Sequence, residues 1–259
     1  MGRQAVVLSI EGLTRRFGGL TAVDDLTFTV KEGAIHGLIG PNGAGKTTTF
    51  NVISGFYRPT SGRVIYAGRD ISGMATHAVA ALGLVRTFQA TTLFHELTVA
   101  ENVLAGCHLG ARIGLASVLL GRQRERQEQA QARVEEILAF MGLDGVAGES
   151  CANLPHGLQR TLGVAVALAA EPRLLLLDEP FTGMNPDETR RMMDLVRQVR
   201  DRGVTILLVE HDMQAVMGLC ETITVLNFGS LLAEGDPEAI RTNPEVVDAY
   251  LGTPIEGVA

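Results

Sequence analysis

The nine residues GPNGAGKTT, from Gly40 to Thr48, restrict the fold of this chain more than any other stretch. They fit the pattern G-x-x-x-x-G-K-[ST] of a phosphate-binding loop, between a short apolar run and a helical pattern. Glycine lets backbone N–H groups turn inward around phosphates, and the helix N-terminus adds favourable partial charge. A chance match in a chain of this length has a probability of about 1%. The loop therefore predicts a nucleotide-binding α/β domain rather than a Gly-rich turn without chemistry.

Individual positions of the loop have predicted roles. Lys46 is expected to reach the β- and γ-phosphates, and the Thr47 hydroxyl is expected to hold Mg²⁺. The remaining predicted nucleotide contacts are Gly40, Pro41, Asn42, Gly43, Ala44, Gly45 and Thr48.

Apolar runs alternate with helical patterns along the rest of the chain. Strand-like runs are predicted at 6–17, 26–30, 63–68, 174–180, 204–210 and 223–229, whereas 90–170 is mostly helical in pattern. A helix over 185–203 is indicated by Asn185 as its N-cap and Pro186 in its first position. This strand–helix–strand order implies a parallel sheet with helices on its faces.

Four polar residues are candidates for phosphoryl-transfer chemistry. Asp178 ends the apolar run LLLLDEP and is predicted to enter the Mg²⁺ shell, while Glu179 is placed to polarise an attacking water. His211 follows another apolar run, at the edge of a parallel sheet where ligands bind. It is either a γ-phosphate contact or a histidine in an exposed turn. Gln89, which ends RTFQ, could ligate Mg²⁺ or orient water, although most glutamines are simply surface residues.

These motifs, in this order and spacing, resemble the ATP-binding subunit of ABC transporters over nearly the whole chain. The resemblance implies an α/β P-loop NTPase with a mostly parallel sheet core, an antiparallel β subdomain and a helical subdomain. It divides a single ABC ATPase domain, 1–259, into three parts: a nucleotide-binding core (1–89 and 171–235), a helical subdomain (90–170) and a C-terminal helical tail (236–259). ATP and Mg²⁺ are the implied cofactors, with Thr47, Gln89 and Asp178 around the metal.

The resemblance also assigns catalytic and base-binding roles to single side chains. Glu179 is similar to the catalytic base, His211 to the switch histidine and Gln89 to the Q-loop residue. Phe17 resembles the aromatic side chain that stacks on adenine, with Val23 beside it; a core phenylalanine is the alternative. The sequence TGMN (182–185) resembles the loop that crosses to a second subunit, although asparagine replaces the usual aspartate at its end.

A departure from the family pattern occurs in the signature loop, which is usually Leu-Ser-Gly-Gly-Gln and completes the ATP site of a neighbouring subunit. The corresponding residues here are Leu154, Pro155, His156, Gly157, Leu158 and Gln159. Pro155 lacks a hydroxyl and an N–H, and His156 brings a ring where a small residue is usual. We therefore expect a weakened site in the neighbour and, as a hypothesis, a heterodimer with one full and one weakened site; a homodimer stays open.

Two segments narrow the resemblance to one group of transporters. The long segment 104–135 and the ending EGDPEAIRTNPEVVDAYLG are similar to ATP-binding subunits of branched-chain and other hydrophobic amino-acid uptake systems of bacteria. This implies transmembrane permease subunits and a second ATPase subunit as partners. It also implies a peripheral position on the cytoplasmic face of the inner membrane, held there by the permeases. Residues 90–103, with Leu93, Phe94 and Leu97, could offer an apolar docking patch; core packing is the alternative.

Composition weighs against other classes of function. No run reaches the roughly 18 apolar residues of a membrane span, and the net charge of −7 argues against nucleic-acid binding. A soluble ABC-type ATPase acting on nucleic acid or ribosomes is a second hypothesis. Tandem cassettes or a long coiled-coil insertion would favour it, and the chain has neither. A non-catalytic ATP sensor is a third hypothesis, against which stand the intact Lys46, Asp178, Glu179 and His211.

Overall fold

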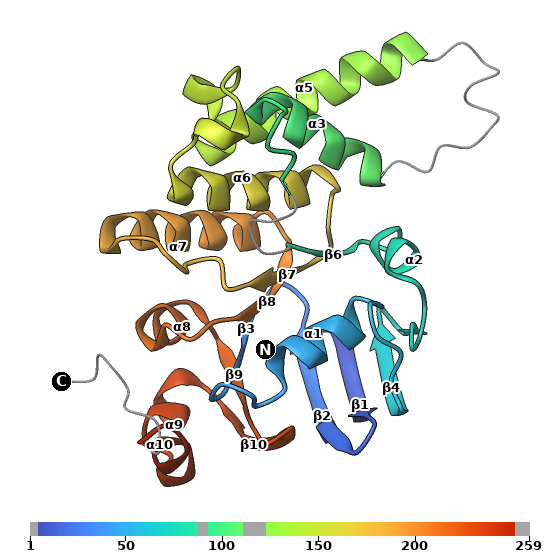
Figure 1. Cartoon of the computed structure of the whole chain (residues 1–259), viewed down its shortest axis with the longest axis vertical. Helices are drawn as coiled ribbons and strands as arrows, with labels where there is room; N and C mark the ends of the chain where they lie inside the picture. The colour runs from blue at the N-terminus through green and yellow to red at the C-terminus, as the bar shows by residue number, and fades with distance from the viewer. Residues whose placement is uncertain (1–4, 88–92, 111–122, 252–259) are drawn as a thin grey trace.

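The central feature of the computed structural model, which describes residues 5–87, 93–110 and 123–251, is a six-stranded sheet (Figure 1). Neighbouring strands are parallel except for β9 and β10, which form an antiparallel hairpin. In spatial order the strands are β10 (Ser230–Gly235), β9 (Thr222–Asn227), β3 (Ile35–Ile39), β8 (Thr205–Val209), β7 (Leu174–Asp178) and β6 (Leu84–Arg86). The predicted mostly parallel core is thus confirmed.

The three middle strands are buried along their whole length because helices or a second sheet cover both faces. Alternate residues point to opposite sides: Leu175 and Leu177 join one apolar cluster, whereas Leu174 and Leu176 join the other. The carboxyl ends of β3, β8 and β7 lie at the same edge of the sheet, and this edge carries the candidate site.

The second sheet is antiparallel and packs over α1 (Lys46–Ile53) on one side of the central sheet (Figure 1). Its strands in spatial order are β2 (Leu20–Lys31), β1 (Val6–Phe17), β4 (Ser61–Tyr66) and β5 (Arg69–Asp70). The sequence predicted a strand only over 26–30 and a polar link before it. In the structure this link is mostly strand, because β1 and β2 pair down to Phe17 and Leu20, with register shifts on the way.

A helical region lies on the other side of the central sheet (Figure 1). It contains α3 (Val99–Gly110), α5 (Gln123–Met141) and α6 (His156–Ala169), with short 3₁₀ turns at Asp144–Val146 and Cys151–Asn153. The apolar face predicted on α5 is buried, with Val134, Ile137, Leu138 and Met141 each at most 3% exposed. Helices α3 and α6 approach closely at Gly106, where a Cβ atom would lie 2.3 Å from the carbonyl oxygen of Val166.

The remaining helices surround the sheet. They are α2 (Thr76–Ala80), α7 (Pro186–Asp201), α8 (Met213–Leu219), α9 (Pro237–Arg241) and α10 (Pro244–Leu251). The N-terminus of α7 is capped as predicted: the Asn185 side chain accepts hydrogen bonds from the backbone N–H groups of Asp187 and Glu188. No helix among the described residues is long and apolar enough to cross a membrane.

Candidate nucleotide-binding and hydrolysis site

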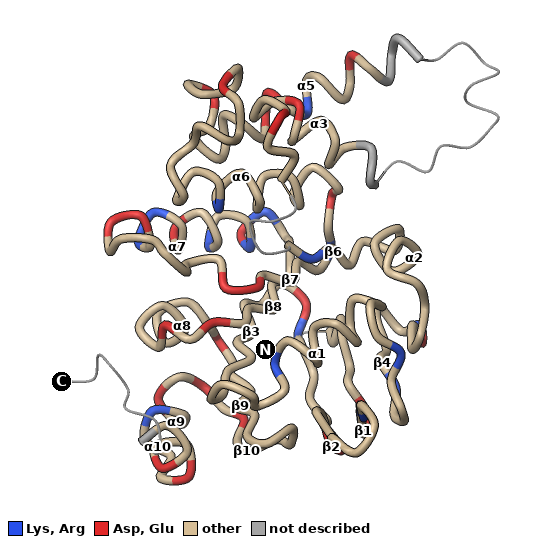
Figure 2. The backbone as a smooth tube through the Cα atoms, viewed as in Figure 1, with Lys and Arg blue, Asp and Glu red and all other residues tan. Residues whose placement is uncertain are grey.

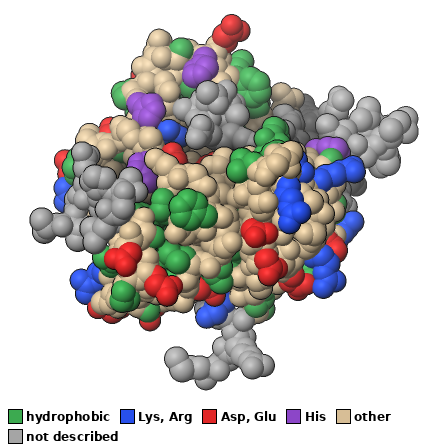
Figure 3. Space-filling view, turned by 60° about the horizontal axis from the view of Figure 1, so that its bottom comes forward, with side chains coloured by type: hydrophobic (Ala, Val, Ile, Leu, Met, Phe, Trp, Pro, Cys, Tyr) green, Lys and Arg blue, Asp and Glu red, His purple; other side chains and the backbone are tan. Residues whose placement is uncertain are grey.

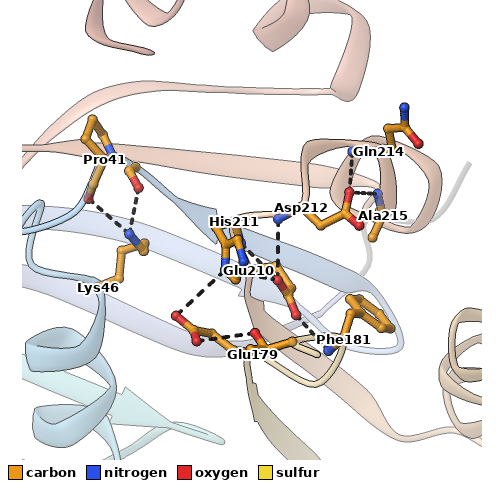
Figure 4. Close-up of polar contacts among 11 residues, drawn as sticks. Pro41, Lys46, Glu179, Phe181, Glu210, His211, Asp212, Gln214 and Ala215 are labelled. Atoms are coloured by element: carbon orange, nitrogen blue, oxygen red, sulfur yellow. Dashed lines mark hydrogen bonds and ion pairs between the residues drawn. The ribbon is translucent and has the colours of Figure 1, made fainter. Parts of the chain in front are cut away.

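The phosphate-binding loop joins β3 to α1, as the sequence predicted. Gly45 adopts a left-handed conformation with φ 102° directly before the first helical residue, Lys46. The Lys46 ammonium donates hydrogen bonds to the carbonyl oxygens of Gly40 (2.6 Å) and Pro41 (3.0 Å), so the side chain folds back along its own loop (Figure 4). Asn42, Gly43 and Thr47 are exposed at the loop surface, whereas Ala44 is buried.

Two glycines of the loop are fixed by close backbone contacts. A Cβ atom on Gly40 would lie 2.2 Å from the carbonyl oxygen of Leu226, and one on Gly45 would lie 2.5 Å from that of Ala22. Both positions also have positive φ, so side chains are excluded on conformational grounds as well. The loop is therefore held against β2 and β9, two strands from different sheets.

Val23 and Ala44 have buried side chains at the phosphate-binding loop. Val23, which was predicted beside the adenine-stacking Phe17, has a fully buried side chain that lies against Gly45. Ala44 accepts a hydrogen bond from the backbone N–H of Gly229, in the turn between β9 and β10. The burial of Val23 has a simple cause: β2 passes directly beneath the loop, so its inward-facing residues join the core. The role of Val23 in the nucleotide site stays a prediction.

The base-stacking candidate Phe17 ends β1 and is 37% exposed. Its ring meets the edge of the Tyr57 ring at a centroid distance of 5.1 Å, and the Arg15 guanidinium lies 4.4 Å from the Phe17 ring centre. Phe17 is thus not a core phenylalanine. An aromatic surface next to a cation, at the end of a strand pair, can still accept a flat base.

The acidic pair lies at the carboxyl end of β7: Asp178 is the last residue of the strand and Glu179 follows it, and the tube in Figure 2 is red where the chain leaves β7. Burial lowers the pKa of Lys46, and the nearby carboxylates of Glu179 and Asp178 oppose that shift. The fold therefore places the predicted lysine close enough to both predicted acids for their charges to interact. Glu179 has φ 49°, an unfavourable value for a residue with a side chain. Backbone strain of this kind is often concentrated at functional sites.

Asp178 forms a buried ion pair that the sequence reasoning missed. The Arg86 guanidinium lies 2.6 Å from Asp178 Oδ2, with side-chain exposures of 7% and 4%. Arg86 also donates a hydrogen bond of 2.6 Å to the side-chain oxygen of Asn51 in α1. It therefore connects β6, the helix after the phosphate-binding loop and the end of β7. Its position three residues before Gln89 was the only available signal, and spacing alone does not reveal its partner.

His211 lies just beyond β8, beside the acidic pair. Its Nδ1 atom is 4.0 Å from Glu179 Oε1 and 3.6 Å from Glu210 Oε2, and its side chain is 61% exposed (Figure 4). The structure thus brings His211 next to Glu179, with an exposed ring open to a ligand. Gln89 lies outside the described residues.

The signature loop packs against the loop that precedes α7 and against the first turn of α7 in the same chain. A Cβ atom on Gly183 would lie 2.9 Å from the His156 ring, and one on Gly157 would lie 2.8 Å from the Glu188 carboxylate. Helix α6 begins at His156 with Pro155 as its N-cap and no side-chain cap. Pro155 therefore removes a capping hydroxyl, whereas the N–H it lacks is not one that α6 would present.

The other signature residues are structural in this conformation. Leu154 is buried, Leu158 is half-buried, and the Gln159 amide donates to the carbonyl oxygens of Cys151 and Leu154. The face that can meet a neighbouring subunit is accordingly formed by Pro155 and His156, which are both exposed.

The predicted docking patch is divided in the structure. Leu93 is buried in the core, whereas Phe94 is 58% exposed and Leu97 is half-buried; residues 90–92 lie outside the described residues. Leu93 faces inward because it packs with the helical region, so it offers no docking surface. On the face drawn in Figure 3, apolar side chains occur mostly as separate spots between charged ones.

Fit to the implied cofactors can be judged from the donors present. Among the described residues, no group of three or more His, Cys, Asp or Glu side chains could hold a metal ion without further ligands. One carboxylate, Asp178, and one exposed hydroxyl, Thr47, suit Mg²⁺, which binds through one or two protein groups plus phosphates. The exposed loop in front of α1 suits those phosphates.

Comparison with known proteins decides the family. A family model described as "ABC transporter" matches residues 23–182. The chain belongs to the ABC transporter ATP-binding family. A second model, described as "Branched-chain amino acid ATP-binding cassette transporter", matches residues 230–255, the ending that the sequence singled out.

Individual relatives agree with this assignment. The chain is 45% identical over 249 residues to the high-affinity branched-chain amino acid transport ATP-binding protein LivG of Salmonella typhimurium, covering 95% of this chain and 98% of that protein. It is 43% identical over 253 residues to the corresponding BraF of Pseudomonas aeruginosa, with the same coverage. Among solved structures, the ADP conformation of MJ1267, an ATP-binding cassette of an ABC transporter, matches with a TM-score of 0.86 and 29% identity over 96% of this chain and 99% of that chain. The predicted family and fold class are confirmed.

Proposed function

We propose that this ABC family member binds and hydrolyses ATP to power the uptake of branched-chain or other hydrophobic amino acids through separate permease subunits. The observation that carries the proposal is the meeting of Lys46, Asp178, Glu179 and His211 at one edge of the parallel sheet. The substrate class is supported by full-length similarity to LivG and BraF and by the family match at 230–255.

The chain's own residues divide the work of hydrolysis. Lys46 and the loop N–H groups hold the phosphates, and Phe17 offers its ring to the base. Mg²⁺, held by Thr47 and Asp178 with Gln89 as a further ligand, would supply charge stabilisation to the transferring phosphoryl group. Glu179 accepts a hydrogen bond from the attacking water and orients it. His211, beside Glu179, contacts the γ-phosphate end of the nucleotide.

The partners follow from the same proposal. Head-to-tail pairing with a second ATPase subunit brings its signature loop to this chain's phosphate-binding loop. Pro155 and His156 of this chain then face the partner's nucleotide. We retain the heterodimer with one full and one weakened site as a hypothesis. Permease subunits hold the pair at the cytoplasmic face of the inner membrane.

Isolation of the complex from native membranes tests the assembly. We expect the chain to be recovered with two permease-like proteins and a second ATPase subunit. Recovery of the chain alone, or with nucleic acid or ribosomes, would contradict the transport assignment. The alternative of a soluble ABC-type ATPase predicts recovery with nucleic acid or ribosomes.

A Glu179→Gln variant in the recovered complex tests the hydrolysis step. The amide keeps the shape of the side chain but has no negative charge and cannot take up a proton from the attacking water, so turnover should fall at least about 100-fold. ATP binding, measured by equilibrium titration, should stay within about twofold of the wild type. Absence of hydrolysis in the wild-type complex would instead favour the non-catalytic sensor.

A further inference from the structure

One buried carboxylate connects the loop of Glu179 to the loop of His211. Glu210 directly follows β8, and its side chain is fully buried. Its Oε1 accepts the backbone N–H of Phe181 at 2.8 Å, two residues after Glu179. Its Oε2 accepts the N–H of His211 at 2.9 Å and that of Asp212 at 3.4 Å (Figure 4).

We propose that Glu210 is a positioning residue that holds these two loops in register and keeps the proton of the His211 ring on Nδ1. Only the expected effect of Glu210 on turnover depends on the proposed ATP hydrolysis. The structural part of the proposal concerns side chains of this chain alone and can be measured without nucleotide.

The buried carboxylate of Glu210 occupies a position where a charge is costly. A buried charge is expensive unless it is hydrogen-bonded, and an apolar residue would pack into such a site without that cost. Burial raises the pKa of Glu210, and the N–H groups of Phe181, His211 and Asp212 and the His211 ring oppose that shift. Three backbone donors from two loops converge on this carboxylate, so it fixes their separation. A direct backbone hydrogen bond, from Glu179 N to Val209 O at 2.9 Å, reinforces the same connection.

The geometry of the His211 ring also supports the proposal. Its Nδ1 faces carboxylate oxygens of both Glu210 and Glu179, at 3.6 and 4.0 Å. A neighbouring carboxylate favours a proton on the ring nitrogen that faces it, which determines the role of the other nitrogen. Glu179 is partly exposed, whereas Glu210 is fixed by its backbone partners, so Glu210 provides the constant part of this field.

A Glu210→Gln variant tests the proposal, with Thr205→Val as the matched control. Thr205 lies at the opposite end of β8, is equally buried, and accepts the backbone N–H of Gly33 at 2.9 Å. Each variant removes one buried oxygen that accepts a backbone N–H, from the first residue of β8 in Thr205→Val and from the residue directly after β8 in Glu210→Gln. Only Glu210 lies between the catalytic loops.

The decisive readout is the tautomer of His211, measured on the full chain by ¹⁵N NMR of the histidine rings and assigned with a His211→Ala spectrum. Glu210→Gln should lower the ratio of Nδ1-protonated to Nε2-protonated ring at least about fivefold, whereas Thr205→Val should leave it unchanged. In the assembled transporter, Glu210→Gln should lower kcat by about 10- to 100-fold, as a displaced catalytic group does, with KM within twofold. An unchanged tautomer ratio in Glu210→Gln, or an equal change in Thr205→Val, would overturn the proposal.

A shorter acid keeps the proposal testable if the glutamine variant does not fold. Glu210→Asp retains a carboxylate next to His211 but is one methylene too short to reach Phe181 N. It should keep the tautomer ratio nearer to the wild type than to an uncharged variant, yet lower kcat. A tautomer change without an effect on kcat would support the ring constraint and count against the proposed role of His211 in hydrolysis.

Discussion

The buried ion pair between Arg86 and Asp178 makes a quantitative prediction about stability. Arg86→Met removes one partner and leaves the Asp178 carboxylate in a site where the two side chains are only 7% and 4% exposed. Breaking a buried pair in this way costs about 3–5 kcal/mol, because the remaining charge is desolvated and uncompensated. At about 2–4 °C per kcal/mol for a chain of this size, the thermal midpoint should fall by roughly 6–20 °C.

A matched control separates this effect from the loss of any arginine. Arg63 pairs with Glu11 at 2.8 Å, but its side chain is 63% exposed and that of Glu11 38%. Arg63→Met should therefore cost at most about 1 kcal/mol, since water screens exposed pairs. The two variants remove the same side chain from ion pairs of similar length and differ mainly in burial.

Denaturant unfolding followed by circular dichroism measures both losses. Arg86 also bonds Asn51, so a double-mutant cycle with Asp178→Ala isolates the ion pair. The double variant should be more stable than the sum of the single losses predicts, by about 2 kcal/mol or more. A loss below about 1 kcal/mol for Arg86→Met, or strict additivity in the cycle, would refute the reasoning.

Three further predictions concern other parts of the fold. The double substitution Pro155→Ser and His156→Gly in the assembled complex should raise ATP turnover. Unchanged turnover would count against a weakened site in the neighbouring subunit. Gly106→Ala places a Cβ atom 2.3 Å from a carbonyl oxygen of α6 and should cost about 1–3 kcal/mol in urea unfolding; an equally stable variant would contradict that close approach. Burial lowers the pKa of His36 in the folded chain to about 4, whereas its ordinary pKa is 6.5. Between these two pH values the unfolded chain therefore binds a proton at His36 that the folded chain does not. Stability should therefore fall by about 2 kcal/mol between pH 7.5 and pH 5, and His36→Gln should remove this fall from the unfolding curves.

Local sequence patterns predicted helices, strands and turns well where the structure depends mainly on residues that are neighbours in the sequence. The run LLLLDEP became a buried strand because both faces of a parallel sheet are covered, which requires continuous apolar residues. Asn185 and Pro186 marked the start of α7 because capping depends only on neighbours in sequence. The phosphate-binding loop falls in the same class, since its glycines and helix start are contiguous.

Predictions that needed a distant contact were less successful. The segment between Phe17 and Leu26 was predicted as a polar connection, but most of it pairs with β1. These backbone hydrogen bonds make it a strand although its apolar pattern is weak. Val23 was placed beside the adenine-stacking ring, and Leu93 was left open between a docking patch and core packing; both side chains are buried. An apolar residue near a motif looks the same in sequence whether it faces a ligand or the core. Only the position of the neighbouring strand or helix distinguishes the two.

The groups that hold the site together were the hardest to find, for a physical reason. Arg86 and Glu210 each connect segments that are far apart in sequence: Arg86 lies 92 residues from Asp178, and Glu210 lies 29 residues from Phe181. Burial of a charge is costly, so such groups persist only where several partners converge, and that convergence exists only in the folded chain. Motifs therefore identify the residues that meet the nucleotide, whereas the buried charges behind them determine how rigidly these residues are held. Variants of Arg86 and Glu210 should on this view alter the site without changing any residue that is proposed to contact the nucleotide or Mg²⁺.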